Sequence, residues 1–136
     1  MPAIATNKAV LYSAFTMLIL FVAGCDDARQ YRLENLGASS ALKGELAVSK
    51  DNLGETILDI DVENIADSEN QSFVAWAGNG DHTEKVGVLN ITGTDGELIG
   101  TTKLNQFRLL ITTESSAEVP QPTNVPVLRS PSISTK

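Results

Sequence analysis

The chain has 136 residues, enough for one domain besides a targeting segment. Its 17 acidic and 10 basic side chains give a net charge of −7, which argues against nucleic-acid binding because phosphate backbones would repel such a protein. A single cysteine excludes an internal disulfide and any metal site built from several cysteines.

The first 24 residues have the layout of a secretory signal peptide. Lys8 and the α-amino group precede an apolar run from Ala9 to Val22, and the small residues Ala23 and Gly24 follow it. The apolar run is shorter than the stretch of about 20 residues that spans a membrane comfortably. We therefore predict a signal helix over residues 1–24, which is removed from the mature protein.

The sequence VAGC, which ends at Cys25, resembles a bacterial lipobox. Small side chains at Ala23 and Gly24 let a peptidase approach the backbone, and the Cys25 thiol is the most nucleophilic group available for taking up a lipid. The resemblance implies diacylglyceryl transfer to Cys25, cleavage between Gly24 and Cys25, and acylation of the new amine. Two or three acyl chains make a stable anchor, at roughly 0.8 kcal/mol for each buried methylene. An uncleaved signal anchor or an ordinary buried cysteine is the alternative.

Asp26 and Asp27 directly follow the cysteine. In enterobacterial lipoproteins an aspartate at this place resembles the signal that avoids export to the outer membrane. The resemblance implies retention on the outer, periplasmic face of the inner membrane, and the outer membrane or a Gram-positive cell surface is the alternative. Without such sorting, the two carboxylates are only the acidic start of a tether.

The tether is expected to run from residue 25 to residue 42. Its polar part from residue 28 onward predicts either flexible coil or a short helix around Tyr31 to Leu36. As coil, those 15 residues would reach roughly 20–25 Å, from 5–6 Å times the square root of the length. Such a tether would lift a small domain clear of the lipid headgroups.

From Lys43 onward the apolar residues recur with a period of two, which is typical of strands. In the clearest strand, residues 55–63, Asp59, Asp61 and Glu63 alternate with apolar residues and share the solvated face. The segment GELAVS precedes it across the turn KDNLG, which predicts a hairpin of residues 45–49 and 55–63.

Further strands are expected in QSFVAWAG, KVGVLNIT, ELIGTT, FRLLITTE and VPVLR. The turns NGDH and GTDG separate some of them, the second with the strong turn signal Asp95-Gly96. Six or seven short strands with turn signals about every 8–12 residues predict an all-β, immunoglobulin-like antiparallel β-sandwich over residues 43–129. Trp76 is expected to pack in its core, and residues 130–136 are expected to form a disordered tail.

The row Asp59, Asp61 and Glu63 could bind a hard cation such as calcium, but calcium sites gather their ligands from curved loops. A solvated face that discourages edge pairing is the simpler interpretation. His82, the only histidine, is expected at the surface of a turn rather than in a metal site. It is also the only histidine that could activate a serine or threonine nucleophile, so we predict a non-catalytic protein without a metal or other cofactor.

The segment FRLLITTESSAEVPQPTNVPVL resembles the closing stretch of the extracytoplasmic domain of anti-sigma-K-type factors. In that family a strand ends in Thr-x-Glu, here Thr112 to Glu114, and Pro-x-Pro-Thr, here Pro120 to Thr123, precedes a last apolar strand, here Val125 to Leu128. Because prolines cannot donate ladder hydrogen bonds, the chain between these strands must cross as an extended, unpaired link. The resemblance implies a β-sandwich outside the cytoplasm over residues 43–129. The chain lacks the family's N-terminal sigma-binding domain with its histidine and two cysteines, so inhibition of a sigma factor does not carry over.

Three functions stay open from the sequence. The leading hypothesis is a membrane-anchored lipoprotein whose domain contacts another envelope protein or acts as a sensory or accessory module. The second is a periplasmic module that binds a ligand or cation through Asp59, Asp61 and Glu63. The third is a regulator related to anti-sigma factors that lacks the sigma-binding domain, while a hydrolase is disfavoured because there is one histidine.

Overall fold

The computed structural model describes residues 28–37, 41–66 and 70–135 of the chain. Over these ranges the protein is all-β, with ten strands and no helix. Accordingly, the described ranges hold no helix that is long and apolar enough to cross a membrane. The all-β class predicted from the period-two pattern is confirmed.

All ten strands pair in antiparallel fashion within one sheet. Their order is β5-β4-β8-β9-β1-β2-β3-β7-β6, and β10 pairs with β8 beside this path. The strands are β1 (Arg29–Asn35), β2 (Lys43–Lys50), β3 (Thr56–Glu63), β4 (Ser72–Asn79), β5 (His82–Val88), β6 (Asn90–Thr92), β7 (Asp95–Thr102), β8 (Gln106–Glu114), β9 (Leu128–Arg129) and β10 (Ile133–Ser134).

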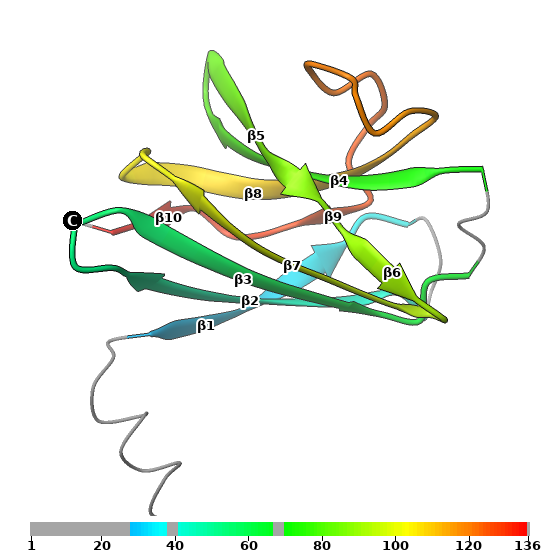
Figure 1. Ribbon diagram of the computed structural model, residues 1–136, viewed down its shortest axis with the longest axis horizontal. Helices are drawn as coiled ribbons and strands as arrows, with labels where there is room; N and C mark the ends of the chain where they lie inside the picture. Colours follow the sequence, from blue (N-terminus) through cyan, green and yellow to red (C-terminus); the bar gives the residue numbers. More distant parts are fainter. Residues whose placement is uncertain (1–27, 38–40, 67–69, 136) are drawn as a thin grey trace, which may run out of the picture.

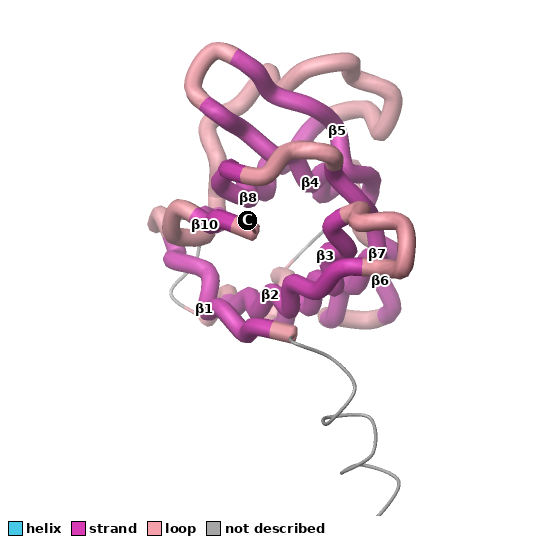
Figure 2. Tube along the Cα trace, turned by 90° about the vertical axis from the view of Figure 1, so that its left-hand side faces the viewer, coloured by secondary structure: helices cyan, strands magenta, loops and turns pink. Residues whose placement is uncertain are grey.

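The sheet rolls into a near-barrel, in which β5, β4 and β8 lie opposite β1, β2, β3 and β7 (Figures 1 and 2). On one side the short strand β9 joins the halves, because it pairs with both β8 and β1. On the other side the chain passes directly from β5 to β6 through the buried Leu89. The structure therefore replaces the predicted immunoglobulin-like sandwich of six or seven strands with a ten-stranded near-barrel.

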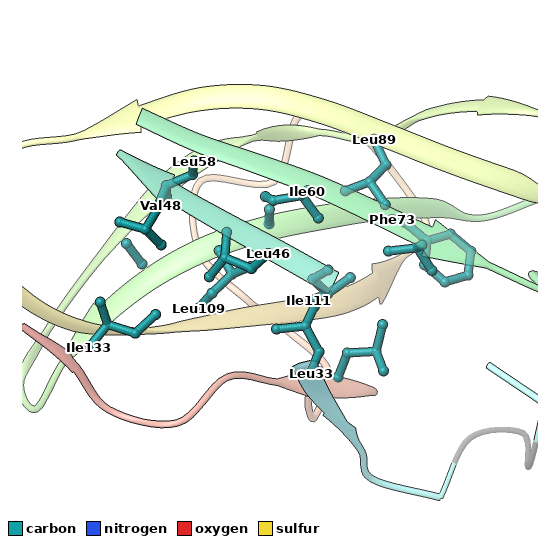
Figure 3. Packing of buried hydrophobic residues seen from close by; sticks show 14 of the residues in the cluster. Leu33, Leu46, Val48, Leu58, Ile60, Phe73, Leu89, Leu109, Ile111 and Ile133 are labelled. Atoms are coloured by element: carbon teal, nitrogen blue, oxygen red, sulfur yellow. The ribbon is translucent and has the colours of Figure 1, made fainter. Parts of the chain in front are cut away.

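The core lies between the two halves of the rolled sheet (Figure 3). Alternating residues of β2 and β3, such as Leu46 and Ile60, point inward and meet Leu109 and Ile111 of β8. These four side chains are fully buried, at 0% exposed. Because most inward residues of the long strands are apolar, with Thr56 and Thr102 as buried polar exceptions, the period-two pattern by itself defines most of this core.

A β-bulge closes the wall between β5 and β7. Ala75 pairs with Gly87 and Trp76 with Lys85, so Val86 is the extra residue of β5. A Cβ on Gly100 of β7 would lie 2.5 Å from Cγ1 of Val86, so only glycine fits there. The bulge thus places Val86 against β7, a strand with which β5 does not pair, and redirecting a side chain is a common role of bulges.

The predicted hairpin of β2 and β3 is confirmed, with pairing from Lys43–Glu63 to Lys50–Thr56. The turn NGDH is also confirmed, since Gly80 (φ 62°) and Asp81 connect β4 to β5. A positive φ at the first of two turn residues matches a type II′ hairpin turn.

The predicted turn at Asp95-Gly96 is wrong by two residues. Gly93 (φ 65°) and Thr94 make the turn between β6 and β7, and Asp95 and Gly96 belong to β7. Gly96 is needed inside that strand for close packing, because a Cβ there would lie 3.1 Å from side-chain atoms of Ile65 and Leu89.

The tether predicted for residues 25–42 is wrong over its described part, because Arg29 to Asn35 form strand β1. Leu33 is 4% exposed and packs over Gly44 of β2, where a Cβ would lie 2.7 Å from Cδ1 of Leu33. Most residues of β1 are polar, so the sequence shows no alternating strand pattern there. The strand forms through its pairing with β2.

The disordered tail predicted for residues 130–136 is wrong over its described residues as well. Ile133 in β10 pairs with Phe107 of β8 and is 1% exposed. Ser130 Oγ accepts a hydrogen bond from the backbone N–H of Leu109 at 2.8 Å. The segment is therefore an integral part of the sheet and its core.

Candidate functional site

The lipobox residues Gly24 and Cys25 and the sorting residues Asp26 and Asp27 lie outside the described residues. The described chain begins at Ala28, one residue before β1. The site that the structure does describe is the outer surface of the sheet half made by β1, β2, β3, β7 and β6.

Strand β3 places its acidic residues as predicted. Its burial alternates along the strand, so Asp59, Asp61 and Glu63 are exposed while the residues between them are buried. The inward residues belong to the core, and the three carboxylates therefore share the outer surface of the sheet.

Neighbouring strands extend this feature into a row across the sheet. The register places Glu45 of β2 opposite Asp61 of β3, and Asp61 opposite Glu97 of β7. Arg32 of β1 pairs with Glu45 at one end of the row, and Asn90 of β6 pairs with Glu97 at the other end. Three carboxylates thus stand side by side on adjacent strands, which lie about 4.8 Å apart.

We call Glu45, Asp59, Asp61, Glu63 and Glu97 the carboxylate face. All five side chains are exposed. Like charges directly opposite each other destabilise a sheet, so the row Glu45, Asp61 and Glu97 costs stability, whereas Glu63 lies opposite Lys43 of β2.

The electrostatics of Asp61 show that cost. The pKa of Asp61 is raised above its ordinary value, and desolvation by burial is the largest cause. The negative charges of four neighbours follow in decreasing order: Asp59, Glu97, Glu45 and Glu63. Asp61 is the centre of the row, and a positive charge placed beside it would relieve the repulsion.

The carboxylate face is hollowed rather than flat. A groove of about 940 Å³ lies over it, lined by Arg32, Glu45, Asp61, Glu63 and Glu97 among others. A smaller hollow of about 500 Å³ is lined by Asp59, Asp61 and Glu97 together with Ile99. The face therefore offers a depression in which five carboxylates lie together with the basic side chains of Arg32 and Lys43.

The predicted cation site can be compared with this geometry. Within the described ranges, no three His, Cys, Asp or Glu side chains converge closely enough to hold a metal ion. Each carboxylate of the row is held on its own strand, whereas a calcium site wraps six to eight oxygen ligands around one point. The spacing suits several separate basic groups better than one cation.

His82 lies at the exposed start of β5, as predicted for a surface residue. Its Nε2 is 3.7 Å from Oε2 of Glu84. Neither hollow of the carboxylate face is lined by His82. An exposed imidazole outside these hollows is poorly placed to act as a general base on a bound substrate.

A second group of polar residues, not identified in the sequence, lies on the opposite half of the molecule. Trp76 is fully buried as predicted, but it lies outside the main core cluster. The loop of residues 115–127 lies on the outer side of β4 and β8 (Figure 1). Trp76 lies near the point where this loop is held, since Lys85 Nζ is 6.0 Å from the centre of its ring. Lys85 Nζ holds this loop through the carbonyl oxygens of Ala117 (2.6 Å) and Val119 (3.1 Å).

The side chains beneath this loop form a chain of hydrogen bonds, which we call the Trp76 network: Trp76, Thr112, Glu114 and Thr123. Trp76 Nε1 donates to Thr112 Oγ1 at 2.9 Å, and Thr112 Oγ1 donates to Glu114 Oε2 at 2.7 Å. The backbone N–H of Thr123 donates to the same oxygen at 3.2 Å, and its hydroxyl donates to Glu114 Oε1. Glu114 is thus a buried carboxylate with its acceptors satisfied.

Burial is the largest influence on Glu114 and acts to raise its pKa. Hydrogen bonds from the side chains of Thr123 and Thr112, and from the backbone of Thr123 and Asn124, outweigh burial together, so the pKa is lowered. Hydrogen bonds to the charged form stabilise it. The Trp76 network therefore fixes the loop, and it is structural rather than a site for a ligand.

The sequence carried a signal for this network. Thr112 to Glu114 and Pro120 to Thr123 are the two motifs on which the resemblance to anti-sigma-K-type factors rests. In the structure these motifs meet, since Glu114 accepts both hydrogen bonds of Thr123. The extended, unpaired link predicted from the prolines is wrong, because residues 115–127 form turns and bends and the backbone of Val127 bonds to Ile111 and Leu36. The last strand, predicted over Val125 to Leu128, forms only at Leu128–Arg129.

Comparisons of the chain with protein-family models, curated proteins and solved structures found no match. The lipobox and the anti-sigma resemblance therefore stay predictions from the residues.

Proposed function

We propose that this chain is a non-catalytic lipoprotein of the bacterial cell envelope, anchored through Cys25, whose carboxylate face binds a basic segment of another envelope protein. The observation that carries the binding role is the row Glu45, Asp61 and Glu97 on three adjacent strands. A groove of about 940 Å³ lies over this row.

Electrostatics support a basic partner. The mutual repulsion within the carboxylate face raises the pKa of Asp61 after the effect of burial, and lysine or arginine side chains in the groove would reverse that repulsion. Complementary charge raises association rates and selects among partners more than it adds affinity. Such a partner suits an accessory or sensory module that binds reversibly.

The anchor rests on the residues at the N-terminus. The signal-like segment ends at the only cysteine of the chain, and Asp26 and Asp27 favour the periplasmic face of the inner membrane. Metabolic labelling with palmitate tests this part, because Cys25→Ser should lose the label completely. A labelled serine variant, or residues 1–24 found on the mature protein by mass spectrometry, would contradict the anchor.

Site-specific photo-crosslinking tests the binding role. A photoreactive amino acid at Ile99, 71% exposed beside the carboxylate face, should give a discrete crosslinked product in intact cells. The same residue at Val125, 81% exposed on the covering loop, should not give that product.

The partner's charge is then tested by substitution. The product from Ile99 should be lost in Asp61→Asn/Glu97→Gln and kept in Glu118→Gln, which removes a charge from an exposed loop position. A product that survives neutralisation of the row would contradict the proposal.

Calcium binding is the second candidate, favoured by the same raised pKa of Asp61. Calorimetry of the full chain with calcium decides between the two functions. A heat of calcium binding that is present in the wild type and absent in Asp61→Asn would favour the cation. If calcium gives no heat of binding with the wild type, the basic protein segment remains the proposed ligand of this face.

A further inference from the structure

We infer that the end of the near-barrel at which β1 begins rests on the anionic lipid headgroups, with Leu53 inserted among them. We call this surface the basic end and define it by Arg29, Lys50, Leu53 and Lys103. The inference rests on the proposed lipidation of Cys25 and adds the orientation of the domain on the membrane.

The short distance along the chain from Cys25 to the sheet is the first observation. Strand β1 begins at Arg29, four residues after Cys25. Four residues span at most about 14 Å even when fully extended. The lipidated residue therefore cannot lie further than that from the start of β1, and a coil tether of the predicted length is ruled out.

The direction of the chain selects which end of the near-barrel lies there. β1 and β2 are antiparallel, with Arg29 opposite Val48, two residues before the end of β2 at Lys50. The chain that precedes Arg29 thus leaves the domain on the side toward which β2 runs into the β2–β3 turn. Figure 1 shows the start of β1, this turn and the described C-terminal residues at the same end.

The turn presents an apolar side chain at that end. Leu53 is 91% exposed, the highest among the exposed large hydrophobic residues of the described chain. Asp51 Oδ1 accepts the backbone N–H groups of Leu53 at 2.8 Å and Glu55 at 2.9 Å, which fixes the turn. Leu53 is therefore held outward by a defined turn rather than left there by chance motion.

Basic residues surround Leu53. Lys50 pairs with Thr56 and Thr56 with Thr102, so Lys103 follows directly on the same end of the sheet. Arg29, Lys50 and Lys103 are all exposed. Asp51 and Glu55 lie in the same turn, and Asp26 and Asp27 precede Arg29 in the sequence, so the basic end carries no net positive charge. Its three exposed basic side chains can still contact lipid phosphates individually.

The carboxylate face begins away from this end. Asp59 is the first of its residues on β3 and lies three residues, or about 10 Å, beyond Thr56. An anionic surface attracts lysine and arginine and repels carboxylates within a Debye length of about 8 Å at physiological salt. The proposed orientation places Arg29, Lys50 and Lys103 nearer the lipid than the carboxylate face.

The inference is tested on the full lipidated chain in vesicles of phosphatidylethanolamine and phosphatidylglycerol. Because lipidation consumes the only native thiol, Leu53→Cys introduces one free thiol for an environment-sensitive fluorophore. A nitroxide-bearing lipid should quench this label several-fold more strongly than the same label at Val125→Cys, which is 81% exposed on the covering loop.

Charge substitutions in the labelled protein test the basic residues. Lys50→Gln and Lys103→Gln should each lower the ratio of quenched to unquenched label about fivefold, the factor for one basic residue near an anionic surface. Lys85→Gln, which alters a lysine bound to the covering loop instead, should leave the ratio unchanged.

The lipid anchor on Cys25 and the orientation of the domain are contradicted by different results. If mass spectrometry shows diacylglyceryl on Cys25 but the labels at 53 and 125 are quenched equally, the orientation is overturned and the anchor stands. If Cys25 is unmodified, both are overturned. Quenching at position 53 that ignores both lysine substitutions would overturn the electrostatic part of the inference.

Discussion

Replacing Glu114 with glutamine should lower the free energy of unfolding by about 2 kcal/mol. The carboxylate is 1% exposed and accepts hydrogen bonds from Thr112 Oγ1 at 2.7 Å and from the backbone N–H of Thr123 at 3.2 Å. A hydrogen bond to a charged group contributes roughly 1.5–3 kcal/mol. Glutamine keeps one acceptor oxygen but turns an NH₂ donor toward groups that already donate, so the loss is about that of one such bond.

Urea unfolding measures this change directly. Trp76 is the only tryptophan and belongs to the same network, so its fluorescence reports on the site as well as on the fold. Glu118→Gln removes a charge from an exposed position on the same loop and should change the free energy by less than about 0.5 kcal/mol. If Glu114→Gln costs no more than this control, the network does not stabilise the loop.

The pH dependence of the same variant has a definite sign. The pKa of Glu114 is lowered in the folded protein, since hydrogen bonds to its charged form outweigh burial. The unfolded chain, with an ordinary glutamate pKa of about 4.3, therefore takes up the proton first as pH falls. The stabilisation that the Glu114 carboxylate gives the folded protein is therefore fully present above about pH 4.3, and it is lost as pH falls through the pKa of Glu114 in the folded protein. Curves of stability against pH for the wild type and Glu114→Gln should converge in acid.

Three further substitutions test other parts of the structure by urea unfolding. Asp61→Asn should stabilise the protein by about 0.5 kcal/mol at neutral pH, because it removes a charge that repels Glu45 and Glu97 across the sheet. The pKa of Asp61 is raised in the folded protein, so this gain should vanish below the ordinary aspartate pKa, where the wild-type side chain is neutral. Added salt should also reduce the gain, because it screens exposed charges. Gly100→Ala should cost about 1–3 kcal/mol through its clash with Val86, and Val86→Ala in the same chain should recover part of that loss. Ile133→Ala should cost about 2–4 kcal/mol, whereas Ile99→Ala, at a position 71% exposed, should cost little; equal effects would mean that β10 adds nothing to the core.

The hairpin of β2 and β3 could be predicted from the sequence because its information is local. The period of two assigns each residue of Thr56–Glu63 to a face, and the short turn fixes the register. No distant part of the chain is needed to decide where Asp59 points. The turn between β4 and β5 could be predicted for the same reason, because Gly80 adopts the positive φ of 62° that such a hairpin turn requires.

Strands β1 and β10 could not be predicted because distant contacts decide them. β10 has two residues, and only its pairing with Phe107 and the burial of Ile133 make it a strand. β1 carries only two apolar or aromatic side chains, Tyr31 and Leu33, among five polar ones. Its strand depends on Gly44, whose missing side chain makes room for Leu33.

The candidate site could be predicted only in part, because local alternation places some of its residues and distant strand pairing places the others. Three of its carboxylates follow one strand and could be placed from their alternation. Glu45 and Glu97 join them only because β2 and β7 flank β3, and strand order is not encoded in local periodicity. The row across the sheet, whose charges raise the pKa of Asp61 after the larger effect of burial, is therefore a product of topology.

The two outer surfaces of the near-barrel differ in what covers them, since one lies beneath a loop and the other is open to solvent. This difference favours a binding role for the carboxylate face. On β4 and β8 the outward residues include Val74 and Trp76, and the loop of residues 115–127 covers that half. On β2, β3 and β7 the outward residues include Glu45, Asp61 and Glu97, and a groove lies over these three carboxylates. A purely structural surface would not need repulsive charges in register across three strands, since alternating signs would be more stable there. Neutralising the row should therefore make the domain more stable while the crosslinked partner is lost, a pair of opposite effects that a merely solvated face would not show.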